Sequence, residues 1–290
     1  SLQVSGDEID EAVAAVEPKF LEILRKAAEN IRSFHSRQVR HDFVINDQPG
    51  VVLGQRVIPL ERGGLYVPGG TAAYPSSVLM NAVPAKIAGV EEVIMVTPPL
   101  KDGTANPDIL VAAALAGVDR IFLMGGAQAV AALAYGTESI PKVDKIVGPG
   151  NIYVATAKRI LYGVVDIDMI AGPSEILVMA DSTANPKFLA ADLMSQAEHD
   201  VLASSILLTT DKAVAEATVK ELERQMALLS RNEIIEQSLT GYGAIIVCRT
   251  VDEMVNLANE LAPEHLEVMM ENPLAYLGRL DNAVCARAVR

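Results

Sequence analysis

The first sixty residues change from helical periodicity to short alternating runs. Between about Gly6 and Arg40, apolar residues recur at steps of three and four, as on one face of an amphipathic helix, and Asp7 is placed to cap its start. Beyond this stretch the apolar residues gather in two short runs, 43–45 and 51–53, with Pro and Gly between them. The pattern predicts an N-terminal helix followed by a hairpin or small strands.

From Leu65 onward, strand-like apolar runs alternate with helical stretches of about ten residues. Such alternation indicates α/β units whose mainly parallel sheets are covered on both faces. Two α/β halves meet near residues 168–174, with no low-complexity linker between them. The predicted strands are 65–67, 93–96, 121–124 and 145–147 in the first half, and 175–179, 206–208, 244–247 and 266–269 in the second. The predicted helices are 76–87, 109–116, 128–135, one ending at 160, 186–198, 213–229 and 251–261.

Composition and charge narrow the class of protein. A chain of 290 residues is long enough for two domains of ordinary size. The net charge, 24 − 37 = −13, and the absence of a basic cluster argue against a nucleic-acid partner. The longest apolar run, 109–118, is too short to span a bilayer, so we interpret it as a buried helix and expect no membrane association. Two cysteines without a pairing pattern, and no signal peptide, favour a cytoplasmic protein.

Three glycine-bearing turns follow predicted strands in the first half, at 68–70, 125–126 and 148–151. Ligands of α/β sheets bind beyond the carboxyl ends of strands, where helix N-termini offer free N–H groups and glycine lets a phosphate approach the backbone. None of the turns completes the G-x-G-x-x-G fingerprint of dinucleotide-binding proteins. Tight turns without a ligand would show the same glycines. From spacing alone, a dinucleotide site and purely structural turns are therefore both possible interpretations.

Gln196 and His199 lie three residues apart at the end of a predicted helix and are expected to share one face. Imidazole is a common zinc ligand, whereas a Gln carbonyl is an uncommon one. Taken alone, the pair fits a surface or capping histidine better than a metal site. Asp192, four residues earlier, is either a partner of these side chains or an exposed acid.

Glu264 and His265 lie between a predicted helix and a predicted strand, where a side chain can face a cleft. An imidazole beside a carboxylate can exchange protons near neutral pH, although the dipeptide alone fits a surface ion pair better. A thioester route has little support, because Cys248 lies in an apolar run and no base is predicted near Cys285. His35 and His41, the two remaining histidines, are interpreted as structural.

Six ordered blocks of this sequence form a longer pattern: 65–70, 125–129, 142–151, 167–175, 191–200 and 263–266. They include Gly148-Pro149-Gly150-Asn151, Ser195-Gln196-Ala197-Glu198-His199-Asp200 and Pro263-Glu264-His265-Leu266. These blocks resemble histidinol dehydrogenase, and their order and spacing match that family from about residue 2 to about residue 280. That family oxidises L-histidinol to L-histidine, the last step of histidine biosynthesis, in two NAD-dependent steps through histidinaldehyde, with one zinc ion per site.

The resemblance assigns a role to each candidate residue. It implies that His265 takes protons during the hydride steps and that Glu264 activates the water that attacks the aldehyde, as a general base must. Zinc would mainly orient the substrate. The implied NAD contacts are Tyr66, Gln128 and Asn151, the implied zinc ligands are Gln196 and His199, and the implied substrate contacts are Ser174, Gln196, His199 and His265.

The family fold consists of two interleaved Rossmann-like domains. The resemblance therefore implies a discontinuous first domain, 1–65 plus 174–290, with the zinc and acid/base residues, and a second domain, 66–173, with the NAD-binding turns. Residues 284–290 depart from the family, and no histidine follows His265. We expect a chain shortened at both ends, with an incomplete zinc site, impaired turnover, and a family homodimer weakened by the lack of a swapped C-terminal tail.

Two other functions remain open at this point. One is a non-catalytic α/β scaffold that binds a nucleotide, which would bind NAD without zinc uptake or turnover. The other is a related zinc- and NAD-dependent dehydrogenase of another polar alcohol, which a substrate panel would identify.

Overall fold

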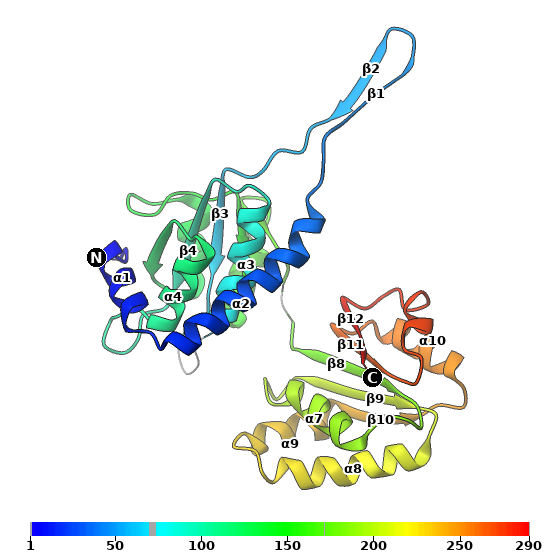
Figure 1. The fold of residues 1–290 in the computed structure, drawn as a ribbon. Coiled ribbons are helices and arrows are strands. Elements are labelled where there is room, and N and C mark those ends of the chain that lie inside the picture. Colours follow the sequence, from blue (N-terminus) through cyan, green and yellow to red (C-terminus); the bar gives the residue numbers. More distant parts are fainter. Residues whose placement is uncertain (1, 70–73, 171, 290) are drawn as a thin grey trace. The chain divides into compact units, whose positions relative to one another are not determined.

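The computed structural model describes residues 2–69, 74–170 and 172–289, and it divides into two compact units, Ser1–Ala171 and Gly172–Arg290 (Figure 1). Each unit is built on a five-stranded sheet whose neighbouring strands run parallel. The predicted α/β class with mainly parallel sheets is therefore confirmed. The boundary between the units falls inside the junction expected at 168–174.

The sheet of the first unit is buried between helices, as its continuous apolar strands require. Leu65 and the run Val93–Val96 are fully buried. Helix α4 (Pro107–Ala116) has six buried residues, which confirms the buried helix expected at 109–118. The strand order is β5 (Arg120–Leu123), β4 (Glu92–Thr97), β3 (Arg62–Tyr66), β6 (Lys145–Val147) and β7 (Asp166–Ile167), and the other helices that follow strands are α3 (Pro75–Ile87), α5 (Gly126–Tyr135) and α6 (Ile152–Leu161).

The predicted N-terminal helix is two helices, α1 (Gly6–Ala15) and α2 (Pro18–His35), followed by the short 3-10 helix η1 (Ser36–Gln38). The break occurs because Pro18 disfavours helical backbone in the residue before it and is itself suited to a first helical position. The cap of α1 is Ser5 and not Asp7: the Ser5 hydroxyl accepts the Glu8 N–H, and the Glu8 carboxylate accepts the Ser5 N–H.

Helices α1 and α2 pack within the first unit, where Ala12 and Leu24 join the core formed by α3 and α4. The apolar faces of the two helices are covered by this core, with Ile9, Val13, Phe20 and Leu21 packed at its margin. The domain division implied by the resemblance, 1–65 plus 174–290 and 66–173, stays a prediction.

The predicted hairpin is present as β1 (Phe43–Gln48) and β2 (Val51–Gln55), which pair antiparallel. It extends away from the sheet and helices of its own unit (Figure 1). All of its residues are exposed, including Val44 at 70% and Val52 at 73%. A two-stranded hairpin without a covered face has no core of its own. The result is an apolar arm on the first unit.

The sheet of the second unit has a distinct core on each face. On one face, Leu266 and Val268 pack with residues of α10 (Val251–Leu261). On the other face, Met269 packs with Leu189 and Leu193 of α7 (Pro186–Ala197). The strand order is β10 (Gly243–Val247), β9 (Ser204–Thr209), β8 (Glu175–Ala180), β11 (His265–Met269) and β12 (Cys285–Val289), with further helices α8 (Lys212–Met226), α9 (Asn232–Tyr242) and α11 (Leu274–Leu277).

Four elements were not predicted: β7, α9, α11 and β12. Strand β12 lies in the stretch 284–290 that departs from the family pattern, yet it pairs parallel with β11 and places Cys285 level with His265. A strand of this kind carries little sequence signal, because its burial pattern is exposed at four of five positions. In the described ranges, no helix combines the length and the apolar character needed to cross a bilayer.

A buried lysine holds the turn between β6 and α6. Lys158 is 2% exposed, donates to the Gly148 carbonyl at 3.0 Å and forms an ion pair with Asp168. The other carboxylate oxygen of Asp168 accepts the Gly148 N–H at 2.7 Å. The turn that leads to Asn151 is thus fixed by a charge pair inside the fold.

We predict that Lys158→Met lowers the free energy of unfolding by about 3 kcal/mol, because it leaves the Asp168 charge without its partner. Urea denaturation followed by circular dichroism measures the change. The matched variant Lys19→Met, at an exposed position of α2, is expected to alter stability by less than about 0.5 kcal/mol. Equal effects of the two variants would contradict the role given to Lys158.

Helix α10 ends at Ala262 in the left-handed conformation, with φ 49° and ψ 56°. Among the residues that the structure describes, Ala262 is the single non-glycine with positive φ. The conformation closes the helix and directs the chain through Pro263 into Glu264 and the start of β11. Backbone strain is therefore found next to the candidate acid/base pair.

We predict that Ala262→Gly raises the free energy of unfolding by about 0.5–1 kcal/mol, since the relief of left-handed strain exceeds the added entropy of the unfolded chain. The control Ala213→Gly, in the first turn of α8, should instead lower stability by about 0.5–1 kcal/mol. Thermal denaturation of both variants gives the two signs, and a loss of stability in Ala262→Gly would refute the strain.

Candidate functional site

The three residues implied as NAD contacts line one cavity at the carboxyl edge of the first sheet. Tyr66 ends β3, Gln128 lies in the first turn of α5 after β5, and Asn151 precedes α6 after β6. The cavity has a volume of about 390 Å³. Its lining residues are Tyr66, Pro68, Gly69, Pro98, Pro99, Gly125, Gly126, Gln128 and Asn151.

The polar groups around this cavity differ in how firmly they are held. The Tyr66 side chain is buried, and its hydroxyl accepts the Gly126 N–H at 3.0 Å, which fixes the ring against the start of α5. The Asn151 Oδ1 accepts the N–H groups of Tyr153 and Val154 at 3.1 and 3.2 Å and so caps α6. The Asn151 amide nitrogen carries two further donors. Gln128, in contrast, is exposed.

The glycines of the turns are required by the fold itself. A Cβ on Gly125 would lie 2.4 Å from Pro98 Cγ, and one on Gly148, where φ is +108°, would lie 2.1 Å from the Tyr66 carbonyl oxygen. These glycines therefore allow segments of the protein to approach one another, whatever they do for a ligand. Gly70, in the first of the three predicted turns, lies outside the described residues.

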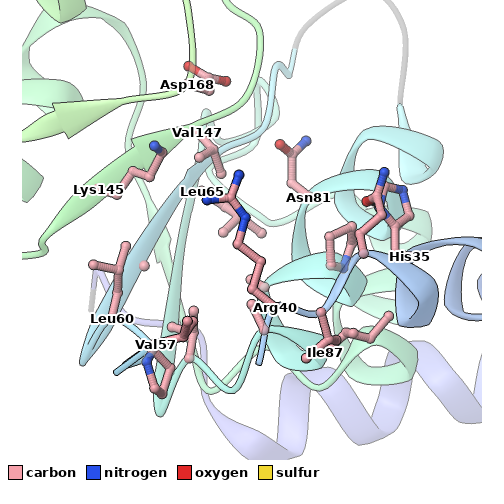
Figure 2. A pocket seen from close by; sticks show the side chains of 18 of the residues that line it. His35, Arg40, Val57, Leu60, Leu65, Asn81, Ile87, Lys145, Val147 and Asp168 are labelled. Atoms are coloured by element: carbon pink, nitrogen blue, oxygen red, sulfur yellow. Dashed lines mark hydrogen bonds between the residues drawn. The ribbon is translucent and has the colours of Figure 1, made fainter. Parts of the chain in front are cut away.

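A second cavity of the first unit, about 640 Å³, contains none of the predicted site residues (Figure 2). Its walls are mostly apolar, and its charged residues include Lys145 and Asp168. Both charges have partners, because Lys145 donates to Asp166 at 2.7 Å and Asp168 pairs with Lys158. His35 borders this cavity and shares a 2.6 Å hydrogen bond with Gln38.

The remaining candidate residues gather at the amino edge of the second sheet. Helix α7 runs back from the end of β8 to the start of β9, so its last residues lie where the parallel strands begin. Short contacts tie this edge together: the Ser204 N–H donates to the Ser174 carbonyl at 3.0 Å, and the Glu264 N–H donates to the Glu175 carboxylate at 3.3 Å. Ligands of α/β sheets usually bind at the opposite edge.

Glu264 and His265 form a half-exposed pair at the start of β11. The Glu264 Oε1 lies 3.8 Å from the His265 Nε2, which is too long for a direct hydrogen bond. The two side chains are 44% and 31% exposed, so both remain open to solvent. The other ring nitrogen of His265, Nδ1, is buried without a hydrogen-bond partner in the described part of the chain.

Gln196 and His199 are close in the chain but not equivalent in the structure. Helix α7 ends at Ala197, so Gln196 is in its last turn and His199 follows it, with the His199 N–H donating to the Gln196 carbonyl at 3.0 Å. The shared helix face predicted from their spacing is therefore interrupted by the helix end. Within 2–69, 74–170 and 172–289, no cluster of three or more His, Cys, Asp and Glu side chains is placed to hold a metal ion.

Two features of this edge were missed from the sequence. Cys285 lies level with His265 on the neighbouring strand, and its N–H donates to the Glu264 carbonyl at 2.9 Å. Glu267 and Asp192 meet one layer below the edge. The alternation of side chains along β11 was the signal for Glu267, because it places Glu267 on the same face as His265. Strand β12 gave no such signal.

The two cysteines differ in burial, which affects the reactivity of their thiols. Cys248 is buried, and this burial, with a smaller effect of Glu253, raises the pKa of its thiol. A buried thiol of this kind is a poor nucleophile, which agrees with the interpretation of the apolar run around it. Cys285 is exposed.

Comparison with known proteins gives one consistent family. The family model described as histidinol dehydrogenase matches residues 1–286. Histidinol dehydrogenase of Clostridium acetobutylicum is 58% identical over 283 residues, which are 98% of this chain and 66% of that protein. The crystal structure of histidinol dehydrogenase from Elizabethkingia anophelis superposes with a TM-score of 0.96 at 42% identity, over 99% of this chain and 66% of that one.

More distant structures share the fold alone. A propionaldehyde dehydrogenase from Rhodopseudomonas palustris gives a TM-score of 0.56 at 12% identity, covering 98% of this chain and 80% of that chain. The chain spans 66% of the length of both histidinol dehydrogenases named above. Since the family model matches nearly all of its residues, the chain belongs to the histidinol dehydrogenase family.

Proposed function

We propose that this chain carries the NAD-binding cavity and the acid/base pair of a histidinol dehydrogenase, which oxidises L-histidinol to L-histidine in two NAD-dependent steps through histidinaldehyde. The observation that supports this most directly is the meeting of Tyr66, Gln128 and Asn151 around one cavity. The chain spans 66% of the length of the Clostridium acetobutylicum relative, and the proposed reaction is that of the whole enzyme.

The residues around the first cavity suit a dinucleotide. Two helices, α5 and α6, begin at its wall, and the positive ends of their dipoles favour a negatively charged group there. Tyr66 supplies a fixed aromatic wall, while Gln128 and Asn151 supply amide groups at the rim. NAD, when bound, accepts the hydride from the substrate.

The acid/base pair has the chemistry that alcohol oxidation needs. A base must take the hydroxyl proton as the hydride leaves, and we assign this task to the His265 imidazole. A second base must take a proton from the water that attacks the aldehyde, and we assign this task to the Glu264 carboxylate. The two groups lie 3.8 Å apart, so one bound substrate can contact both. Ser174, which directly precedes β8, is assigned to substrate binding.

The zinc donors do not form a complete set. Gln196 and His199 are our proposed ligands, but a catalytic zinc normally has three protein ligands. No larger group of His, Cys, Asp and Glu side chains is found in the described ranges. We therefore derive no step through zinc, and we propose that turnover by this chain is impaired relative to its longer relatives.

The proposed enzyme is a cytoplasmic homodimer. The apolar arm, β1 and β2, supports self-association because its side chains have no cover within their own unit. A second copy would bury residues such as Val44 and Val52.

We predict that the chain binds NAD and that Gln128→Ala weakens this binding about fivefold, through the loss of one polar contact. Isothermal titration calorimetry measures the affinity. Gln237→Ala, an exposed change on α9, serves as the matched control and should leave it unchanged. A chain that binds no NAD would overturn the proposed function.

With L-histidinol and added zinc, we predict slow NADH formation that His265→Asn lowers on the order of 100-fold, because the base for the hydroxyl proton is lost. The control is His41→Asn, an exposed histidine outside the site. Turnover as fast as that of a full-length relative would contradict the proposed impairment. NAD binding with no turnover at all would favour a nucleotide-binding scaffold, and turnover of another polar alcohol in preference to histidinol would indicate a different substrate.

We predict that the double variant Val44→Lys and Val52→Lys weakens dimer formation at least about tenfold, by placing charge in the surface that a second copy buries. Sedimentation velocity over a concentration series measures the dissociation constant. Leu228→Lys introduces a charge at a residue of the second unit that is 74% exposed and should have no effect. A wild-type chain that stays monomeric throughout the series would refute the homodimer.

A further inference from the structure

Two carboxyl groups meet inside the second unit, one layer below the amino edge of its sheet. Asp192 belongs to α7 and Glu267 to β11, and the two side chains are in hydrogen-bond contact. Glu267 is only 7% exposed, and its Oε2 has no donor among the described residues. Neither residue has a role in the proposed chemistry.

Two ionised carboxylates cannot hydrogen-bond to each other, because both are acceptors. Contact between them therefore requires a proton on one side, as in other buried carboxyl pairs. Burial raises the pKa of Glu267, and the neighbouring Asp192 charge raises it further. The pKa of Asp192 is also raised by burial, but its bond to Glu267 acts in the opposite direction. Glu267 is therefore the partner that holds the proton.

The charged groups that face the pair are few. Arg287 lies opposite Glu267 on β12, with its Nη1 3.7 Å from the Glu267 Oε1. Its side chain is 63% exposed, so solvent weakens the attraction. The other influence on each carboxyl group is its partner in the pair. Arg287 lowers the pKa of both acids without replacing the proton between them.

The contact between Asp192 and Glu267 determines how far Gln196 and His265 lie along the strand direction, toward the amino edge of the sheet. Along α7, Gln196 follows Asp192 by four residues, a rise of about 6 Å. Along β11, His265 precedes Glu267 by two residues, about 6.6 Å toward the same edge and on the same face of the strand. Met269, on that face as well, belongs to the same core cluster as Leu189 and Leu193 of α7. A bond between Asp192 and Glu267 thus brings Gln196 and His265 to the same height.

We propose that Asp192 and Glu267 share one proton across the contact between α7 and β11, and that this bond holds Gln196 level with His265. The two acids are positioning residues: they act through the side chains above them. The roles of Gln196 and His265 rest on the proposed function, whereas the shared proton does not.

The shared proton is tested by the pH dependence of thermal unfolding. A group whose pKa is raised in the folded state contributes stability that is complete below its unfolded pKa and is lost as the pH rises through its folded pKa. The wild type should therefore lose stability relative to Glu267→Gln as the pH rises above the ordinary pKa value of a glutamate, 4.5, by a Tm difference of about 2 °C or more. The amide of the variant still donates to Asp192 but does not titrate.

Glu223→Gln is the matched control, since Glu223 is exposed on α8. Its Tm profile should run parallel to that of the wild type. Parallel profiles for the wild type and Glu267→Gln would overturn the shared proton.

The positioning role is tested by NMR of the histidine side chains, of which the chain has four. The signal of His265 is identified by its loss in His265→Asn. Glu267→Ala should shift this signal and leave those of His35 and His41 in place, and Glu267→Gln should restore it. Asp192→Ala, at a half-buried helix position that tolerates alanine, breaks the same bond from the other side if Glu267→Ala does not fold.

A His265 signal that is unchanged in a folded alanine variant would overturn the positioning role. Neither measurement uses NAD, zinc or histidinol. A failure of the proposed enzymatic function would therefore leave both results interpretable.

Discussion

Parallel pairing of β8 with β11 is the constraint on which the second half of the candidate site depends. Because the two strands run in the same direction and in register from Ile176 and His265, their first residues must lie at one edge. Helix α7, which returns the chain to the start of β9, must then end at that edge too. The direction of the strands, and not distance in the chain, therefore places residues 174, 196, 199, 264 and 265 at the same edge of the sheet.

The two units use opposite ends of similar sheets. In the first unit the cavity lies after the strands, where the N-termini of α5 and α6 supply partial positive charge. In the second, the candidate residues lie before the strands, where the helices α7 and α10 end, so side chains are the groups assigned to the chemistry. Binding of a negative charge is thus assigned to helix N-termini after the strands of the first sheet. Proton transfer is assigned to side chains before the strands of the second sheet.

The periodicity of apolar residues predicted most of the helices and strands, and the elements that it missed have physical explanations. The apolar strands and α4 were predictable because burial on both faces leaves continuous apolar runs. Strand β12 was not, since its mostly exposed residues have no such pattern. The packing of α1 and α2 against α3 and α4 depends on tertiary contacts that periodicity does not identify. In the candidate site, Tyr66, Gln128 and Asn151 were predicted from the family resemblance. The contact between Asp192 and Glu267 could not be predicted, because the sequence does not show which helix faces β11.

The hairpin β1–β2 is the whole of its own sheet, so each strand has an outer edge with unpaired N–H and C=O groups. The two strands contain exposed Val and Ile residues. Other sheets of the chain protect their central strands by neighbours on both sides, but this arm offers a template for strand addition. The arm is therefore the segment at which newly made copies at high concentration are most exposed to aggregation, before any assembly covers it.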